Sequence, residues 1–171
     1  MSKVRQNYHE ECEAAVNQTI NRQLTSSYMY LSMAFHFDRD DVALKGFHDY
    51  FKGMSDSKRE HAMVLLKFQN ERGGRIKMND IKVIAKDEFG SVLETMELAL
   101  DAEKASNTNY LELYNVAEKH HDEQMADFVE DMFLAKQTEV IKSVGEHITN
   151  IKRVGPGLGE YQFSANLGAS A

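Results

Sequence analysis

Residues 44–72 read LKGFHDYFKGMSDSKREHAMVLLKFQNER, and the spacing of the large residues in this segment predicts the fold class. Its large residues recur at steps of three and four, which is the spacing of one face of an α-helix. The inward positions are Leu44, Phe47, Phe51, Met54, Lys58, His61, Leu65 and Phe68. A helix with one apolar face packs that face against other helices. Gly46 and Gly53 each disfavour a helix by roughly 1 kcal/mol relative to alanine, so any break is expected near residues 53–55.

Three other segments, roughly residues 10–38, 91–118 and 123–153, repeat this period. Their inward positions are Val16, Ile20, Gln23, Ser27, Tyr30, Ala34 and Phe37 in the first, Leu93, Met96, Leu100, Glu103, Asn107, Tyr110, Tyr114 and Ala117 in the second, and Leu134, Gln137, Ile141, Val144, Ile148 and Ile151 in the third. The chain has a single proline, so long segments run without interruption. Four amphipathic helices predict an all-α four-helix bundle.

The connections between these segments set the topology. Residues 38–41 make a short link between the first two helices, and Asp122 is a good N-cap for the fourth. Residues 73–90 form a long connection, which permits a crossover between parallel helices. After the Gly-Pro-Gly stretch, roughly residues 160–167 are long enough for a short C-terminal helix only. We expect a single domain over residues 1–171, with the bundle over roughly 10–153.

Composition narrows the classes of function. The chain has 171 residues, 20 of them basic and 27 acidic, and its net charge of −7 argues against non-specific binding to nucleic acid or anionic membranes. Cys12 is the only cysteine, which excludes an intrachain disulfide and a thiolate metal cluster. The polar beginning of the chain and the lack of a long apolar run predict a cytoplasmic protein. Any metal must be held by oxygen and nitrogen ligands.

Six polar side chains fall at the inward positions of the four helices. They are Gln23, Tyr30, Lys58, His61, Glu103 and Gln137. Buried charges are costly unless they are paired and hydrogen-bonded. These six residues therefore form either a metal site or a network in which the polar side chains hydrogen-bond to one another.

The stretch Lys58-Arg59-Glu60-His61 bears directly on this choice. A glutamate three residues before a histidine shares its helix face, and this Glu-x-x-His pattern recurs in di-iron bundles. Here lysine, which offers only donors, takes the glutamate's place, and Glu60 projects about 100° away from His61. We favour a buried ion pair of Lys58 with Glu103, with His61, Gln23, Gln137 and Tyr30 hydrogen-bonding around it. The alternative is a single weak metal site at His61 and Glu103.

Five stretches of the chain resemble animal ferritins. They are residues 4–9 (VRQNYH), 37–44 (FDRDDVAL), 59–62 (REHA), 69–75 (QNERGGR) and 159–161 (GEY). The resemblance covers nearly the whole chain. It implies a ferritin-like bundle that assembles into a hollow cage of 24 subunits, takes up Fe(II) through threefold channels and holds it as ferric mineral. The short last helix would line channels on the fourfold axes.

The resemblance also assigns roles to the inward polar residues. Heavy-type ferritin subunits oxidise Fe(II) at a centre with a glutamate on the first helix, Glu-x-x-His on the second, a glutamate on the third, a glutamine on the fourth and a nearby tyrosine. This sequence keeps His61, Glu103 and Gln137 as metal ligands, and Tyr30 and Gln137 at the catalytic positions of that centre. Gln23 and Lys58 replace the two other glutamates. Lysine at the second position resembles light-type subunits, which lack this activity, whereas His61 is a heavy-type trait, so the chain has mixed features. We expect an impaired ferroxidase centre.

Further residues match ferritin sites on other surfaces. Asp127 and Glu130 match the carboxylates of the threefold channel, although acids near a helix start also suit the helix dipole. Asp56 and Glu60 match positions at which light-type subunits nucleate mineral, or they are a solvated helix face. The adjacent His120 and His121 are either cation ligands near the channel or simply solvated histidines.

Three functional hypotheses follow. The leading one is an iron-storage subunit that oxidises Fe(II) weakly or not at all, in a cage of its own or with catalytic ferritin subunits. The second is an active ferroxidase with a remodelled di-iron site. The third, from another class, is a helical scaffold without metal.

Overall fold

The computed structural model describes residues 2–82, 86 and 88–168. The ends of the predicted domain, and residues 83–85 and 87 of the predicted connection, lie outside the described residues. Every regular element in the described part of the chain is helical. The elements are α1 (Glu10–Phe37), α2 (Lys45–Glu71), α3 (Val92–Lys119), α4 (Glu123–Val129), the π-helical turn η1 (Glu130–Leu134), α5 (Ala135–Val154) and α6 (Leu158–Gly168).

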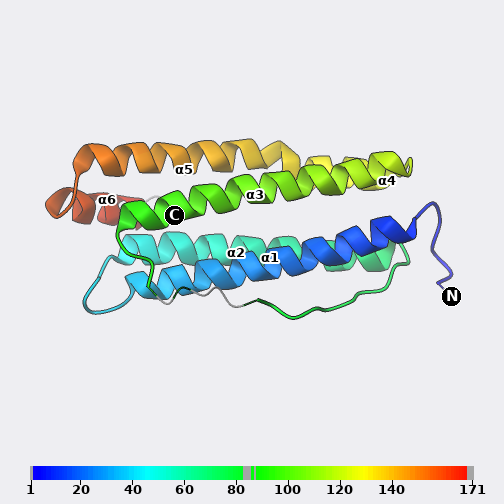
Figure 1. The fold of residues 1–171 in the computed structure, drawn as a ribbon, viewed down its shortest axis with the longest axis horizontal. Coiled ribbons are helices and arrows are strands. Elements are labelled where there is room, and N and C mark those ends of the chain that lie inside the picture. The colour runs from blue at the N-terminus through cyan, green and yellow to red at the C-terminus, as the bar shows by residue number, and fades with distance from the viewer. Residues whose placement is uncertain (1, 83–85, 87, 169–171) are drawn as a thin grey trace.

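Four long rods lie side by side, and α4, η1 and α5 together form one of them (Figure 1). α1 and α2 run antiparallel, as do α3 and α5. The segment after α2 returns along the length of the bundle, so that α3 runs parallel to α2 (Figure 1). The short helix α6 packs against α2 and α5 at one end. The predicted four-helix bundle with a long crossover and a short fifth helix is confirmed.

Local capping interactions fix the helix starts close to the predicted positions. Nδ1 of His9 accepts from the backbone N–H of Glu11 at the start of α1. Ser91 and Glu94 form a reciprocal capping box at the start of α3. The predicted cap of the fourth helix is present, because Oδ1 of Asp122 accepts from the backbone N–H of Met125 at 3.0 Å. Such caps satisfy N–H groups that have no partner inside the helix.

The apolar core has two parts, with the polar residues between them. One cluster contains the first half of α1, including Ile20, and the second halves of α2 and α3. The other contains the second half of α1, including Tyr30, and the first half of α3, including Ala99. Gln23 on α1 and Glu103 on α3 fall between these clusters. The polar group therefore lies near the middle of the bundle, shielded from water on both sides.

The rod formed by α4, η1 and α5 contains a π-helical turn that the sequence did not predict. Across η1 the backbone N–H of Ala135 donates to the carbonyl of Glu130, five residues earlier. A π turn adds one residue to a helix and changes which side chains face inward after it. Here both Phe133 and Gln137 are buried. Phe133 lies within the turn, and Gln137 lies one helical turn after it on α5.

α2 continues without interruption through Gly53, so a break at residues 53–55 is wrong. Packing of an amphipathic face supplies most of the stability of a helix in a protein and outweighs the cost of a glycine. Gly53 is exposed, and a Cβ there would meet nothing within 4 Å. Gly46 differs, because it is buried and its backbone N–H donates to Oγ of Ser164 in α6 at 3.1 Å.

Replacing Gly46 by alanine is expected to displace α6 from α2. The added Cβ would overlap the backbone carbonyl oxygen of Ser164, which has no flexible atom to move away. Amide hydrogen exchange should become faster throughout α6. The matched control is Gly53→Ala in the same helix, which should stabilise the protein by roughly 1 kcal/mol. Unchanged exchange of α6 in Gly46→Ala would show that this contact does not hold the helix.

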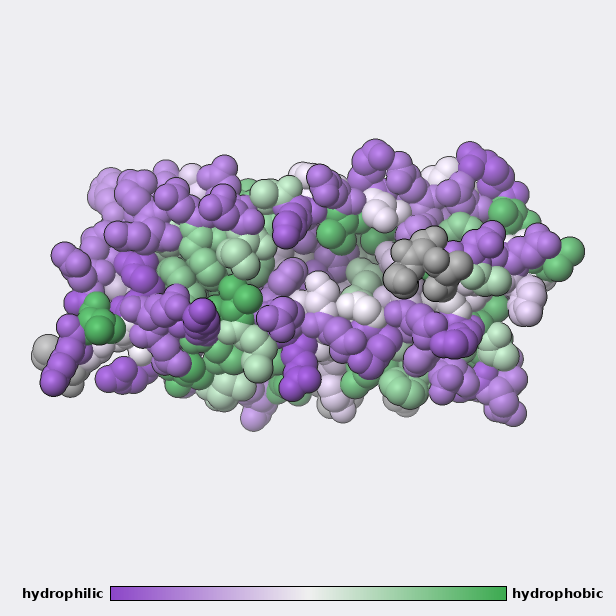
Figure 2. Space-filling model, turned by 180° about the vertical axis from the view of Figure 1, so that it is seen from behind, coloured by the Kyte–Doolittle hydropathy of each residue, from purple (hydrophilic) through white to green (hydrophobic). Residues whose placement is uncertain are grey.

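The outer surface is mainly polar on the face seen in Figure 2, with smaller apolar areas between the hydrophilic residues. None of the helices in the described residues has the length and apolar character needed to cross a bilayer.

Candidate metal centre

A buried ion pair lies at the middle of the bundle, as the sequence predicts. Nζ of Lys58 on α2 donates to Oε2 of Glu103 on α3 at 2.7 Å. Lys58 is 4% exposed and Glu103 is 0% exposed. Oγ of Ser106 lies 3.5 Å from the same ammonium. At this burial each charge depends on the other, because an unpaired buried charge is strongly destabilising.

Glu103 receives two further hydrogen bonds from other helices. Tyr30 on α1 donates its hydroxyl to Oε1 at 2.6 Å. Gln137 on α5 donates Nε2 to Oε2 at 2.7 Å and to the Glu103 backbone carbonyl at 3.0 Å. Burial acts to raise the pKa of Glu103, but the charge of Lys58 and these bonds outweigh it and lower the pKa below its ordinary value. Burial and the nearby carboxylate raise the pKa of Tyr30, so its hydroxyl stays protonated and donates.

Gln23 and His61 do not bond to this ion pair, contrary to the expected network. Both are instead joined to Tyr110, a buried residue of α3. The Tyr110 hydroxyl donates to Oε1 of Gln23 at 3.0 Å and lies 3.3 Å from Nδ1 of His61. The sequence pattern placed Tyr110 at an inward position, but Tyr110 was not included among the polar residues of the centre. Its hydroxyl was the feature that could have indicated this role. The polar set is therefore two networks, one around Glu103 and one around Tyr110.

His61 is set up to be neutral at neutral pH. Burial, assisted by the nearby charge of Lys58, lowers its pKa to about 4 against the opposing effect of Glu103. Phe133 of the π turn lies edge-on to its ring, with centroids 5.3 Å apart. A neutral imidazole retains a lone pair for a metal or a hydrogen bond. Among the polar side chains at the middle of the bundle, His61 is thus the one best suited to bind a metal ion.

The depressed pKa of His61 predicts a loss of stability in mild acid for the metal-free protein. Between about pH 6.5 and 4 the unfolded chain binds a proton at this position while the folded chain does not, so unfolding becomes more favourable as the pH falls through this window. Guanidinium unfolding at pH 7 and pH 4.5 should show a smaller loss in His61→Asn than in the parent. His121→Asn, at an exposed histidine, is the control. An equal loss in all three proteins would contradict the prediction.

A cavity of about 520 Å³ reaches this centre from the side of α2 and α5. Lys58, His61, Glu103 and Gln137 all contribute to its lining, as do the more accessible carboxylates Asp49 and Glu139. The ion pair and His61 therefore have a route to solvent between two helices.

The other predicted site residues lie away from this centre. Asp127 in α4 and Glu130 in η1 are exposed, and neither carboxylate forms a hydrogen bond or ion pair within the described residues. Asp56 is exposed and pairs with Lys52 one turn earlier, at 2.6 Å. Glu60 is exposed on the same helix. Their assignments to a channel and to mineral nucleation stay predictions.

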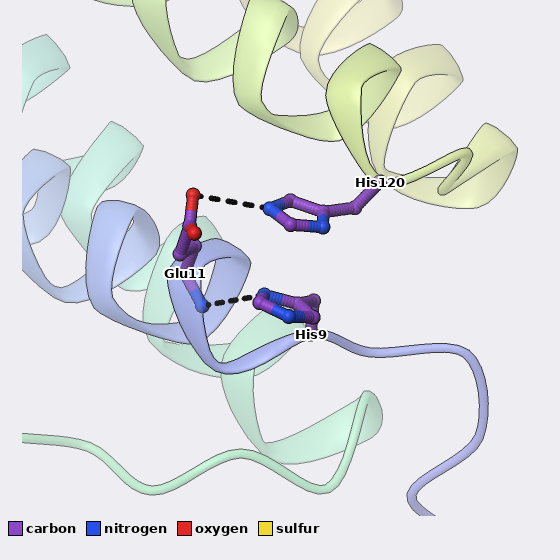
Figure 3. A group of neighbouring side chains, drawn as sticks. All are labelled: His9, Glu11 and His120. Atoms are coloured by element: carbon purple, nitrogen blue, oxygen red, sulfur yellow. Dashed lines mark hydrogen bonds and ion pairs between the residues drawn. The ribbon is translucent and has the colours of Figure 1, made fainter.

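The two adjacent histidines have different surroundings. His121 is exposed, with a positive φ of 53°. His120 is half-buried and lies beside His9 and Glu11 at the start of α1, at the end of the bundle away from α6 (Figure 3). One ligand atom from each of these three residues lies within 4.8 Å of the others. The sequence indicated His120 and His121 but not His9 and Glu11, because these two residues are more than a hundred positions away in the chain.

Comparisons with known proteins agree with this architecture. Residues 13–154 match the model of the ferritin-like domain family. The chain is 55% identical over 163 residues to soma ferritin of Lymnaea stagnalis and 50% identical over 163 residues to a ferritin heavy chain of Echinococcus granulosus, in each case covering 95% of this chain and 94% of the relative. It is 47% identical over 165 residues to the oocyte isoform of ferritin light chain of Xenopus laevis, covering 95% of this chain and 93% of the relative.

The family match covers most of the chain, and these relatives include both a heavy and a light chain. The matched residues span the four rods of the bundle and the long crossover, from α1 to the end of α5. The chain belongs to the ferritin family of iron-storage proteins.

Proposed function

We propose that this ferritin subunit admits and stores iron in an oligomeric cage, while its own bundle centre oxidises Fe(II) weakly or not at all. The observation that supports this is the ammonium of Lys58, 2.7 Å from Oε2 of Glu103. In the resemblance to heavy-type subunits, a carboxylate stands at the position of Lys58. A cation of the protein thus holds the one carboxylate that a metal at this centre would need.

The charge of the centre explains why it should bind two iron ions weakly. Two Fe(II) ions bring four positive charges, and di-iron bundles offset them with several carboxylates. Glu103 is the only carboxylate among the six inward polar residues, while His61 and Gln137 are neutral donors. A metal bound to Glu103 would also face the ammonium of Lys58, unless that side chain moved. These costs oppose occupation of both metal positions.

A remodelled ferroxidase is the second candidate, and the cavity is the observation that favours it. The cavity gives an ion access to His61, whose pKa of about 4 leaves it neutral. If a single Fe(II) displaces Lys58, then His61, Glu103 and Gln137 form its ligand set. Crystals soaked in Fe(II) separate the two proposals, because anomalous density at His61 and Glu103 supports the second and density at Asp127 and Glu130 alone supports the first.

The proposal extends to the assembly and to its other sites. It includes a cage of 24 subunits, alone or with catalytic ferritin subunits, and a cytoplasmic location. Family membership supports assembly, and so do large apolar side chains exposed on the single chain, such as Phe35 at 53%. Asp127 and Glu130 supply the acidic channel for Fe(II), since carboxylates repeated around an axis attract cations. Asp56 and Glu60 then offer carboxylates to the growing mineral.

The decisive experiment measures assembly and iron chemistry on the same preparation. Gel filtration gives the size, and absorbance in air after addition of a few Fe(II) ions per subunit gives the oxidation rate. We expect a large cage that oxidises iron far more slowly than a heavy-type ferritin and still accumulates ferric mineral on prolonged loading. A rate equal to that of the heavy type would contradict the impaired centre. A monomer or dimer without mineral would instead favour the scaffold.

A further inference from the structure

His9, Glu11 and His120 bring three metal-binding side chains together at one end of the bundle. His9 is the N-cap of α1, Glu11 is in its first turn and His120 follows the last residue of α3. Nε2 of His120 lies 3.1 Å from Oε2 of Glu11. The rings of His9 and His120 are stacked, with centroids 3.7 Å apart and planes 10° from parallel. Figure 3 shows both imidazoles on the same side of the Glu11 carboxylate.

A second observation points to a ligand at this position. Nε2 of His120 is buried and, among the described residues, no group meets it in a hydrogen bond of proper geometry. The nearby Glu11 oxygen is close but misaligned. A buried ring nitrogen normally has a well-aligned hydrogen-bond partner, so a contact that is close but misaligned needs an explanation. A metal ion between the two residues supplies one, because it takes the lone pair of the nitrogen and the charge of the carboxylate.

Hydrogen bonds from two side chains already hold the two sides of the group together. The side-chain amide of Asn7 donates to the backbone carbonyl of His121 at 3.0 Å, which ties the segment before α1 to the turn after α3. Arg72 connects the same two segments from α2, through Asp122 at 2.7 Å and the carbonyl of Asn7 at 3.0 Å. Asn7 and His121 both have positive φ, at 45° and 53°. The backbone segments that carry the three residues are therefore already held in place before an ion binds.

We propose that His9, Glu11 and His120 bind a divalent first-row transition ion such as Zn²⁺. Two imidazole nitrogens and one carboxylate oxygen suit Zn²⁺, Cu²⁺ or Ni²⁺, whereas Mg²⁺ and Ca²⁺ prefer oxygen ligands throughout. Three protein ligands leave an open position for water on the ion. The site is separate from the bundle centre, and it does not depend on whether that centre oxidises iron.

Binding requires a small local rearrangement. Ligand atoms around a tetrahedral Zn²⁺ lie about 3.3 Å apart, so the present spread of up to 4.8 Å must contract. The stacked rings must also turn, because each lone pair lies in the plane of its ring. Nδ1 of His9 loses its hydrogen bond with the backbone N–H of Glu11, and this N–H then bonds to solvent. Lys119, which contacts the Glu11 carboxylate at 2.5 Å, moves into solvent at little cost, since the pair is exposed.

The test uses the full assembled protein and Zn²⁺ alone as the probe. Crystals soaked in Zn²⁺ should show anomalous density within roughly 2.0–2.2 Å of one atom from each of His9, Glu11 and His120. Zn²⁺ titration by calorimetry, in the presence of excess Mg²⁺ and Ca²⁺, should show one more site per subunit in the parent than in His120→Asn. Loss of one ligand of three should weaken the site by at least about 10- to 100-fold.

Two matched variants separate binding from folding. His9→Asn removes an imidazole but keeps a side chain that caps helices well, so α1 should retain its start. His121→Asn is the control, because it removes the neighbouring exposed imidazole at a positive φ that asparagine readily adopts. We expect the extra Zn²⁺ site in the parent and in His121→Asn, and its absence in His9→Asn and His120→Asn.

Hydrogen exchange gives an independent readout of the same site. A bound ion would join the first turn of α1 to the end of α3, so Zn²⁺ should slow exchange of the α1 start in the parent and in His121→Asn only. The proposal is overturned if the soaked parent shows no density at the three residues, or if His9→Asn and His120→Asn bind as much Zn²⁺ as the parent. Loss of the site in His121→Asn as well would also overturn the assignment.

Discussion

Replacing Gln23 and Lys58 together by glutamate is expected to raise the initial rate of Fe(II) oxidation by roughly 100-fold or more. The change removes an ammonium from the centre and adds two carboxylates beside His61 and Glu103, which moves the local charge from zero to three negative. Even the outer partners of metal ligands change affinity or activity 10- to 100-fold, so two direct ligands should do at least as much. Absorbance of ferric products during the first seconds after mixing with Fe(II) measures the effect.

The single variants show which part of the change matters. Lys58→Met removes the positive charge without adding a ligand and should raise the rate only slightly. Gln23→Glu adds a ligand but leaves the ammonium of Lys58 in place, so it should also stay slow. A double variant as slow as the parent would mean that the centre lies elsewhere. A parent as fast as the double variant would mean that Lys58 moves away readily.

Replacing Glu103 by glutamine is expected to lower the free energy of unfolding by roughly 3–5 kcal/mol, because it leaves the Lys58 ammonium buried without its counter-charge. The single oxygen of the new amide can still accept from Tyr30, but its NH2 group then faces Lys58 and Gln137, so lost hydrogen bonds add to the effect of the lost charge. Guanidinium unfolding of the metal-free protein at pH 7 measures it. Glutamine is close to glutamate in size, which keeps cavity effects out of the comparison.

The control is the double variant Glu103→Gln with Lys58→Met, which removes both charges. Buried ion pairs replaced by groups of similar volume are often neutral in stability, so the second change should recover most of the loss. A double variant as unstable as Glu103→Gln alone would assign the loss to hydrogen bonds with Tyr30 and Gln137 rather than to the unpaired ammonium. That outcome would also weaken the argument that Lys58 opposes metal binding.

The helices and the buried ion pair were predictable because their signals are local and periodic. The cap at Asp122 sits next to the helix that it starts, and Lys58 and Glu103 stand out as charges at inward positions. A break at Gly53 was wrong, because a local propensity of about 1 kcal/mol is small beside the packing of a whole helix face. The π turn left no trace in the period of large residues.

The partners of the polar residues were harder to predict than the residues themselves. The inward position of His61 in the helical pattern predicts that its side chain is buried. Which group it contacts depends on how far each helix is shifted along the bundle axis. The hydroxyl of Tyr110 therefore takes Gln23 and His61 away from Glu103. Contacts between distant segments, such as that of His120 with Glu11, have no period at all and appear only in three dimensions.

The long crossover connection has a consequence for how the chain folds. It divides the sequence into two helical hairpins, α1 with α2 and α3 with the last long rod, and each has mostly local contacts, which form fast. Lys58 belongs to the first hairpin and Glu103 to the second. A docking of the two hairpins that is offset by one helical turn would bury each charge without its partner. In the folded protein the ion pair is therefore formed only in the register that places Lys58 level with Glu103.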